Sequence, residues 1–153
     1  MEKKLSVSAI KQGTVIDHVT AGNALRIVRL LDLPSGKKQV TVGLNLPSIA
    51  FGYKDIIKVS ERELTADEAN KIAILAPRAT INIIKNYKII KKFKVQIPET
   101  IQSVIICPNP VCVTNNEKIT TFFYAQQKKY TILLRCKYCL KEYSPDKITE
   151  YHT

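Results

Sequence analysis

Long apolar stretches are missing from this sequence of 153 residues. One of the longest, residues 81–84, is interrupted by Asn82 and falls far short of the ~20 apolar residues that a transmembrane helix needs. The opening Met-Glu-Lys-Lys-Leu-Ser lacks the apolar segment of a secretion signal. We therefore expect a cytoplasmic protein with no membrane partner, whose cysteines are reduced or bind a metal.

Histidine is also scarce, and of the two histidines only His18 lies away from the end of the sequence. It follows Asp17 in "GTVIDHV" (13–19), which suggests an acid–base pair. The β-branched residues before this pair predict a strand, on which consecutive side chains point to opposite faces. Asp17 and His18 should then be splayed apart, and no catalytic partner stands near them in sequence. We expect no enzyme; a polar residue with purely structural contacts is the simplest alternative.

The composition is ordinary for a folded protein, but the charge is not evenly distributed. Apolar residues make up 45% and charged residues 24%, and the net charge is +11. Residues 1–96 carry a net charge of +9, and residues 97–153 carry +2. An anionic partner of the first part would explain this surplus, whether nucleic acid, nucleotide or an acidic protein surface. A lysine-rich solvated surface explains it equally well.

Residue periodicity predicts an α+β fold for the first part. A stripe at Ala24, Ile27, Val28 and Leu31 predicts one amphipathic helix, and a T-A-D-E capping box starting at Thr65 begins a second. The elements follow the order strand–helix–strand–strand–helix–strand plus one more strand, over residues 14–19, 24–31, 39–46, 55–60, 65–76, 79–84 and 87–97. This order is typical of a ferredoxin-like antiparallel sheet with two helices on one face.

Pro98 marks the end of this unit, so we expect domains at 1–98 and 99–153. The second is predicted to be small and all-β, with strands at 103–108, 119–125 and 130–135. A segment of this size rarely buries enough apolar surface to fold without a cross-link or a metal.

Four cysteines could supply that cross-link or metal site. "CPNPVC" (107–112) and "CKYC" (136–139) form two knuckles, and the hairpin between them can bring them together. Four thiolates match the tetrahedral preference of Zn²⁺ and leave no open position, which predicts one structural zinc ion held by Cys107, Cys112, Cys136 and Cys139. A disulfide pair, a redox pair or an iron centre remains an alternative.

Several long motifs resemble one family in order and separation. These are "GTVIDHV", "TVGLNLPS" (41–48), "KDIIKVS" (54–60), "LAPRATINIIKNY" (75–87) and the two cysteine knuckles. The chain is similar to the regulatory chains of aspartate carbamoyltransferase over essentially its whole length. That resemblance implies a non-catalytic subunit that controls pyrimidine biosynthesis, with a nucleotide-binding allosteric domain followed by a Cys₄ zinc domain that contacts the catalytic chain.

The resemblance also implies an effector site for nucleoside triphosphates, typically CTP and ATP. Asp17 would accept a hydrogen bond from a ribose hydroxyl, with Lys58 alongside, while His18 and Lys92 would face the triphosphate. Asn82 and Ile84 would line the site. The base and sugar would meet Val7, Ala9 and Ile10, and the base would also contact Tyr87 and Ile89. Since Asp17 and His18 are expected on opposite faces, the ligand would lie across a strand end or edge.

The implied partners are a second regulatory chain and the catalytic chain, in a hetero-dodecamer of two catalytic trimers and three regulatory dimers. The catalytic-chain contact would lie near Asn109, Lys128 and the Lys137-Tyr138 knuckle. The sequence departs from the family pattern at Ser8, Val111 and Leu140, which bears on base preference and on subunit contacts.

A basic nucleic-acid-binding protein with a zinc ribbon is the alternative function. Against it, the sequence has no RNP1-like run, and the predicted central strands carry no aromatic residues for base stacking.

Overall fold

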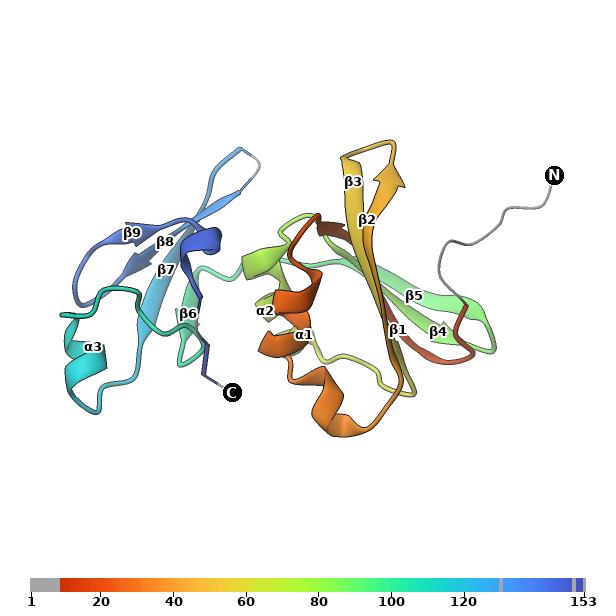
Figure 1. Ribbon diagram of the computed structural model, residues 1–153, viewed down its shortest axis with the longest axis horizontal. Helices are drawn as coiled ribbons and strands as arrows, with labels where there is room; N and C mark the ends of the chain where they lie inside the picture. Colours follow the sequence, from red (N-terminus) through yellow and green to blue (C-terminus); the bar gives the residue numbers. More distant parts are fainter. Residues whose placement is uncertain (1–8, 130, 150, 153) are drawn as a thin grey trace. The chain divides into compact units, whose positions relative to one another are not determined.

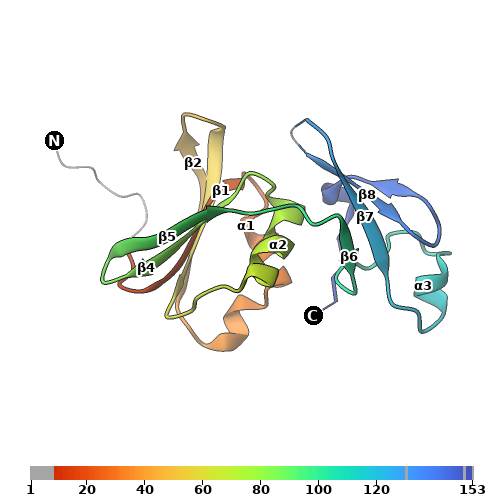
Figure 2. The same cartoon turned by 180° about the vertical axis from the view of Figure 1, so that it is seen from behind.

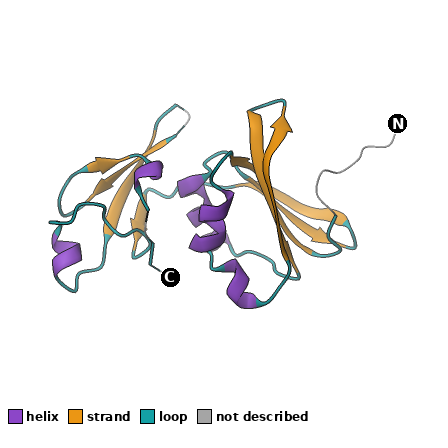
Figure 3. Cartoon of the chain, in the orientation of Figure 1, coloured by secondary structure: helices purple, strands orange, loops and turns teal. Residues whose placement is uncertain are grey.

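The computed structural model describes residues 9–129, 131–149 and 151–152, and the chain divides into two compact units between Gln96 and Ile97. Figure 1 traces the chain and Figure 3 colours it by secondary structure. Each unit has its own sheet. No helix in the described ranges has both the length and the apolar character required to cross a bilayer.

The first unit is an antiparallel sheet with its two α-helices on one face, as the views from opposite sides show (Figures 1 and 2). The spatial order of the strands is β2-β3-β1-β4-β5. The elements are β1 Gly13–Thr20, α1 Ala24–Leu30, a 3₁₀ turn η1 Leu33–Gly36, β2 Val40–Ser48, β3 Gly52–Ser60, α2 Ala66–Leu75, β4 Thr80–Lys85 and β5 Lys88–Lys94. The first four strands have the ferredoxin-like order, and β5 extends the sheet beyond β4, so the predicted α+β fold is confirmed.

Local signals explain most of these boundaries. The capping box at the start of α2 is present, because the Glu68 backbone N–H donates to Thr65 Oγ1 at 3.2 Å and the Glu68 carboxylate accepts from the Thr65 N–H. The β2–β3 hairpin is longer than predicted and pairs as far as Ser48 with Gly52. Pro47 is tolerated in β2 because β2 is an edge strand.

The core of this unit lies between the sheet and the helices. Alternate strand residues are almost fully buried there, including Ile16, Ile57 and Ile81, which the register aligns across three strands. The helices contribute fully buried Ile27 and Ile72. Burying such a side chain contributes roughly 1.5–3 kcal/mol each, which holds the helices to this face.

Asp55 of β3 is a buried carboxylate that joins three parts of the first unit. Its Oδ2 accepts the backbone N–H groups of Gly22 at 2.9 Å and Ala24 at 3.2 Å, where α1 begins. Its Oδ1 accepts the N–H of Asn45 in β2 at 2.9 Å. Asp55 is 0% exposed, so these donors replace its lost hydration.

The second unit is a four-stranded antiparallel sheet of order β6-β7-β8-β9. Its core includes Phe123, Ile132 and Leu134, all fully buried. The elements are β6 Thr100–Gln102, a short α3 Val113–Asn116, β7 Phe122–Gln127, β8 Ile132–Cys136, β9 Glu142–Tyr143 and a 3₁₀ turn η2 Pro145–Lys147.

Two sequence-based predictions for this unit need correction. The predicted strand at 103–108 is wrong: β6 ends at Gln102, and only a single bridge joins Ile105 to Tyr151 beyond it. The strand predicted at 119–125 begins at Phe122, and β9 was not predicted. The first difference has a physical reason, since Cys107 and Cys112 lie in a loop that must curl around their sulfur atoms and cannot extend.

Replacing Asp55 with Asn should destabilise the first unit by about 2–3 kcal/mol. The backbone N–H donors now share two carboxylate oxygens, whereas the amide of Asn has only one acceptor oxygen. Chemical denaturation of the full chain measures this. The matched control is Asp67→Asn, an exposed acid in the first turn of α2, which should cost less than about 1 kcal/mol. Equal losses in the two variants would contradict the role given to Asp55.

Candidate ligand face and metal centre

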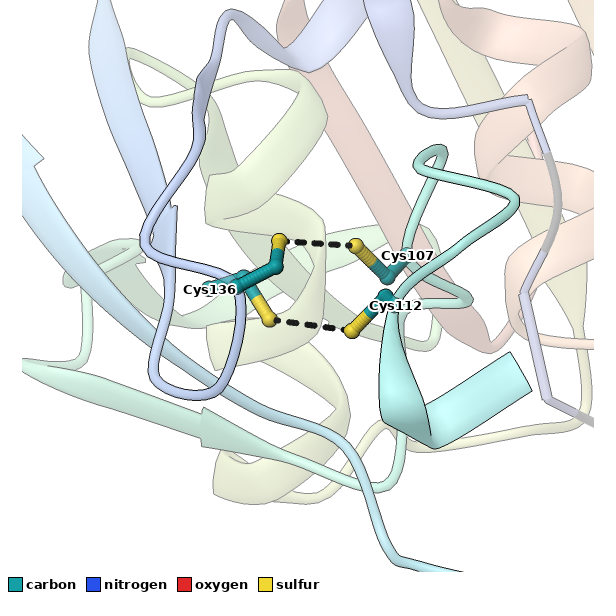
Figure 4. Close-up of side chains that lie close together, drawn as sticks. Cys107, Cys112 and Cys136 are labelled. Atoms are coloured by element: carbon teal, nitrogen blue, oxygen red, sulfur yellow. Dashed lines mark hydrogen bonds between the residues drawn. The ribbon is translucent and has the colours of Figure 1, made fainter. Parts of the chain in front are cut away.

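The four cysteines of the second unit lie together, although 24 residues of sequence separate Cys112 from Cys136. Their sulfur atoms are all within 4.8 Å of one another. The Sγ atoms of Cys107 and Cys139 are 3.8 Å apart, as are those of Cys112 and Cys136, so each close pair joins the two knuckles (Figure 4). All four cysteines are free thiols.

This spacing fits a tetrahedral metal ion and does not fit a disulfide. A disulfide needs its sulfur atoms about 2.05 Å apart. Four thiolates around Zn²⁺ at about 2.3 Å would instead be separated by about 3.8 Å, the edge of that tetrahedron. The Cys₄ set, with no open position, is suited to a structural ion, which would supply stability and no reaction chemistry.

The pKa values of the thiols explain why a cation is needed here. Burial and, to a smaller extent, the neighbouring cysteines raise the pKa of Cys107 to about 12, against the opposing effect of a backbone hydrogen bond from Asn109. Burial acts in the same direction on Cys139, but hydrogen bonds from the Lys141 backbone and the Asn109 side chain outweigh it and lower its pKa to about 7. A divalent cation would allow all four sulfurs to be thiolates at once.

A shell of polar groups surrounds the sulfur atoms. Thr114 Oγ1 lies 3.2 Å from Cys112 Sγ, and Asn115 Nδ2 donates to the carbonyl oxygens of Cys107 and Asn109 at 2.8 Å each. Asn116 Nδ2 donates to the Cys112 carbonyl at 2.9 Å. These three residues were not predicted from the sequence, although a polar run directly after a knuckle cysteine was the available signal.

Residues expected near the catalytic chain are distributed unevenly around this centre. Asn109 is only 7% exposed, and its Oδ1 accepts the N–H of Val111 at 3.2 Å. In contrast, Val111 and Leu140 are 80% and 65% exposed, and Tyr138 is also exposed. Apolar side chains therefore surround the knuckles, at two of the positions where the sequence departs from the family pattern.

The first unit has a second candidate site, on the sheet face away from α1 and α2. Directly opposed residues in antiparallel strands share a face, and Val15 of β1 lies opposite both Lys58 and Asn82, while Asn82 lies opposite Lys92. Asp17 follows two residues after Val15. We call the face that carries Val15, Asp17, Lys58, Asn82 and Lys92 the polar face.

The prediction that Asp17 and His18 point to opposite faces is wrong, because β1 contains a bulge between Ile16 and Val19. Ile16 and Val19 are both 0% exposed, although strict alternation would put them on opposite faces. The extra residue, His18, has a φ of 56°, and its ring Nδ1 lies 2.6 Å from Oγ1 of Thr80, the residue opposite Asp17. Both side chains thus lie on the polar face, and the ligand need not cross a strand edge.

Asp17 is held as a carboxylate by its neighbours. Burial alone would raise its pKa, but the Lys54 ammonium at 2.9 Å, the His18 backbone N–H at 2.6 Å and the charge of His18 together lower the pKa below the usual 3.8. The Lys54 ammonium and the His18 backbone N–H both contact Oδ1 of Asp17. Within the described part of the chain, Oδ2 can therefore accept a further hydrogen bond.

Lys58 and Asn82 are buried to an unusual degree for polar residues, at 7% exposed each. Burial lowers the pKa of Lys58, and the negative charge of Asp17 partly offsets this. Asn82 Oδ1 is fully buried and has no hydrogen-bond partner among the described residues. A buried unsatisfied amide oxygen costs about 1–3 kcal/mol, so it points to a donor supplied from outside the chain.

The remaining residues implied by the resemblance lie toward the start of β1. Ile84 lies opposite both Gly13 and Ile89, and Ile89 and Tyr87 are more than half exposed. Ala9 and Ile10 line a pocket of about 530 Å³ with Thr41 and Ser60 at the ends of β2 and β3. Val7 lies outside the described residues, as does Ser8.

Lys54 and Thr80, which contact Asp17 and His18, were not predicted from the sequence. Neither residue belongs to a motif with chemical meaning of its own. Their positions follow from pairing across β1, β3 and β4, which a single sequence does not reveal.

The fold and the cysteine cluster define a class of protein: a two-unit chain with a ferredoxin-like sheet followed by a small unit with four clustered cysteines. Residues 5–96 match the family model described as "Aspartate carbamoyltransferase regulatory chain, allosteric domain". Residues 99–149 match the model described as "Aspartate carbamoyltransferase regulatory chain, metal binding domain".

Curated relatives agree with both models. The chain is 44% identical over 149 residues to an aspartate carbamoyltransferase regulatory chain of Vibrio cholerae serotype O1 (strain M66-2), covering 97% of this chain and 96% of the relative. The corresponding chains of Vibrio campbellii and Aeromonas salmonicida are 42% and 41% identical, with 97% of each chain covered. The chain belongs to the family of aspartate carbamoyltransferase regulatory chains, which confirms that it is a regulatory and not a catalytic subunit.

Replacing Thr114 with Val should lower zinc affinity about 10-fold without changing the stoichiometry of one ion per chain, because the Cys112 thiolate loses a hydrogen-bond donor. Competition with a chromogenic chelator measures the affinity. Thr120→Val, which alters an exposed threonine of the same unit, is the control and should bind zinc as the unaltered chain does. An unaltered zinc affinity in Thr114→Val would show that the Thr114 hydroxyl does not contribute to metal binding.

Proposed function

We propose that the polar face binds nucleoside triphosphates, with CTP and ATP as effectors, and that the chain transmits this binding to the catalytic chain of aspartate carbamoyltransferase. The observation that carries the proposal is Asn82, which is buried beside Lys58 and Asp17 and whose Oδ1 has no hydrogen-bond partner among the described residues. An amide oxygen buried on the sheet face that bears no helix is costly unless a donor such as a ligand satisfies it.

The chemistry of the polar face changes along β1 in the way that a nucleotide requires. Its start is apolar, with Ile84 and Ile89, and suits a base. Its end carries His18, and β5 carries Lys92 level with Val15 and Lys94 level with Asp17, so this part suits phosphates. Between them Asp17 Oδ2 can accept from a ribose hydroxyl. Gly13 to His18 spans about 16 Å at roughly 3.3 Å per residue, enough for an extended nucleotide.

An anionic ligand would also offset the desolvation of Lys58. At an effective dielectric of 20, an ammonium about 4 Å from one phosphate charge gains about 4 kcal/mol before desolvation. Lys58 has already lost most of its hydration on folding, because it is 7% exposed. Binding there therefore adds little further desolvation cost on the protein side.

The second unit is the proposed contact to the catalytic chain. A structural zinc ion at the Cys₄ centre would hold the knuckles in shape, and the exposed side chains of Val111, Tyr138 and Leu140 offer an apolar docking surface around it. We also propose that regulatory chains form dimers and that three such dimers assemble with two catalytic trimers into a hetero-dodecamer. Coupling of about 1–3 kcal/mol between effector and catalytic chain is expected, and it must be reciprocal.

We do not adopt the nucleic-acid alternative, because both halves of the chain match regulatory-chain models. Binding of a metal by the four clustered cysteines would require them to be reduced, as cysteines are in the cytoplasm, so we also propose a cytoplasmic location.

The full chain should bind CTP and ATP, and Lys92→Gln should weaken both about 10-fold, equivalent to about 1.4 kcal/mol, through loss of a phosphate contact. Isothermal titration measures the affinities. Lys71→Gln in α2 removes the same charge on the side of the sheet covered by helices and should change little. Equal affinities in the Lys92 and Lys71 variants would refute the phosphate contact.

The chain should co-purify with its catalytic chain in the presence of zinc and lose it after complete metal removal by a chelator, because the knuckles then lose their shape. Nucleotide binding by the metal-free chain serves as the control and should persist if the first unit remains folded. A complex that survives full zinc removal would contradict the docking role of the second unit.

A further inference from the structure

Arg78, for which no role was predicted from the sequence, lies next to the end of the polar face. The guanidinium carbon of Arg78 is 4.0 Å from the centroid of the Phe51 ring. The Phe51 ring meets the His18 ring edge to face, with centroids 5.7 Å apart and an angle of 69° between the planes. A single aromatic ring therefore separates the guanidinium from the imidazole.

Three separate segments bring these side chains together. His18 is the extra residue of the β1 bulge, Phe51 lies in the turn between β2 and β3, and Arg78 lies between α2 and β4. Thr80, two residues after Arg78, binds His18 Nδ1 at 2.6 Å. Since Nδ1 is engaged, Nε2 is the imidazole nitrogen that remains for a ligand.

Arg78 differs in its partners from the cations of the first unit that form ion pairs. Lys54 is paired with Asp17, and Arg62 is paired with Glu68. Across the described ranges, no carboxylate lies within ion-pair distance of Arg78, and its recorded contact is the stack on Phe51. A stacked guanidinium keeps its N–H edge available, and that edge matches a phosphate in a bidentate manner.

We propose that Arg78, held on the Phe51 ring beside His18, binds the terminal phosphate of the nucleotide and so makes the site select for the number of phosphates. This rests on the proposed function, because it assumes that a nucleotide occupies the polar face. Phe51 is then a positioning residue: it fixes a long side chain that would otherwise lose rotamer freedom on binding. The remaining contacts of the polar face are left for the base, the ribose and the inner phosphates.

The test is isothermal titration of the full chain with CTP, CDP and CMP, which share the base and sugar and differ in phosphate number. Arg78→Gln should weaken CTP about 10-fold and change CMP less than about 2-fold, because only the triphosphate reaches the guanidinium. Arg78→Lys should fall between, since it keeps the charge and loses the bidentate edge. Phe51→Leu should weaken CTP binding more than CMP binding, and by less than Arg78→Gln does.

The matched control is Arg29→Gln, an exposed arginine on α1 whose loss changes the net charge equally. If Arg78→Gln binds CTP as Arg29→Gln does, or loses CTP and CMP affinity equally, the assignment of Arg78 to the terminal phosphate is overturned while nucleotide binding stands. If the unaltered chain binds none of the three nucleotides, both this inference and the proposed function are overturned.

Discussion

The bulge in β1 is the constraint on which the geometry of the first unit depends. Ile16 and Val19 must both enter the core against α1 and α2, and only an extra residue between them allows this. That residue is His18, in a left-handed conformation that costs roughly 1–3 kcal/mol. Its N–H donates to Asp17 and its ring binds Thr80, so local contacts support the strain. The same extra residue brings Asp17 and His18 onto one face.

A second bulge lies at the same level of the sheet. β2 shifts register between Gly43 and Leu46, on the other side of β3 from the shift in β1. Asp55 stands between the two irregularities: it lies opposite Val19 and accepts the N–H of Asn45, which has a φ of 56°. One buried carboxylate thus fixes the first turn of α1 and the bend in an edge strand. Bulges increase the twist of a sheet, which helps it to curve around two helices.

The second unit depends on a different physical source of stability. Its core is small, and its longest unpaired segments are the loops that present the cysteines. Four thiols at tetrahedral separations, surrounded by hydroxyl, amide and backbone donors, form a site that a metal ion would close. Metal binding and folding are coupled in such units. If a metal supplies the stability, apolar side chains such as Val111 and Leu140 need not be buried in the core and can remain on the surface.

Sequence alone determined the order of the elements in the first unit, the capping box of α2 and the four cysteines as one cluster, because periodicity, caps and knuckle spacing are local properties. The long motifs also determined the family. Tertiary structure decided that Asp17 and His18 share a face, that residues 103–108 are mostly loop and that Asn109 turns inward. It alone joined Arg78 to Phe51 and His18. These features depend on register between distant strands and on loop closure, where one extra residue reverses which way every following side chain points.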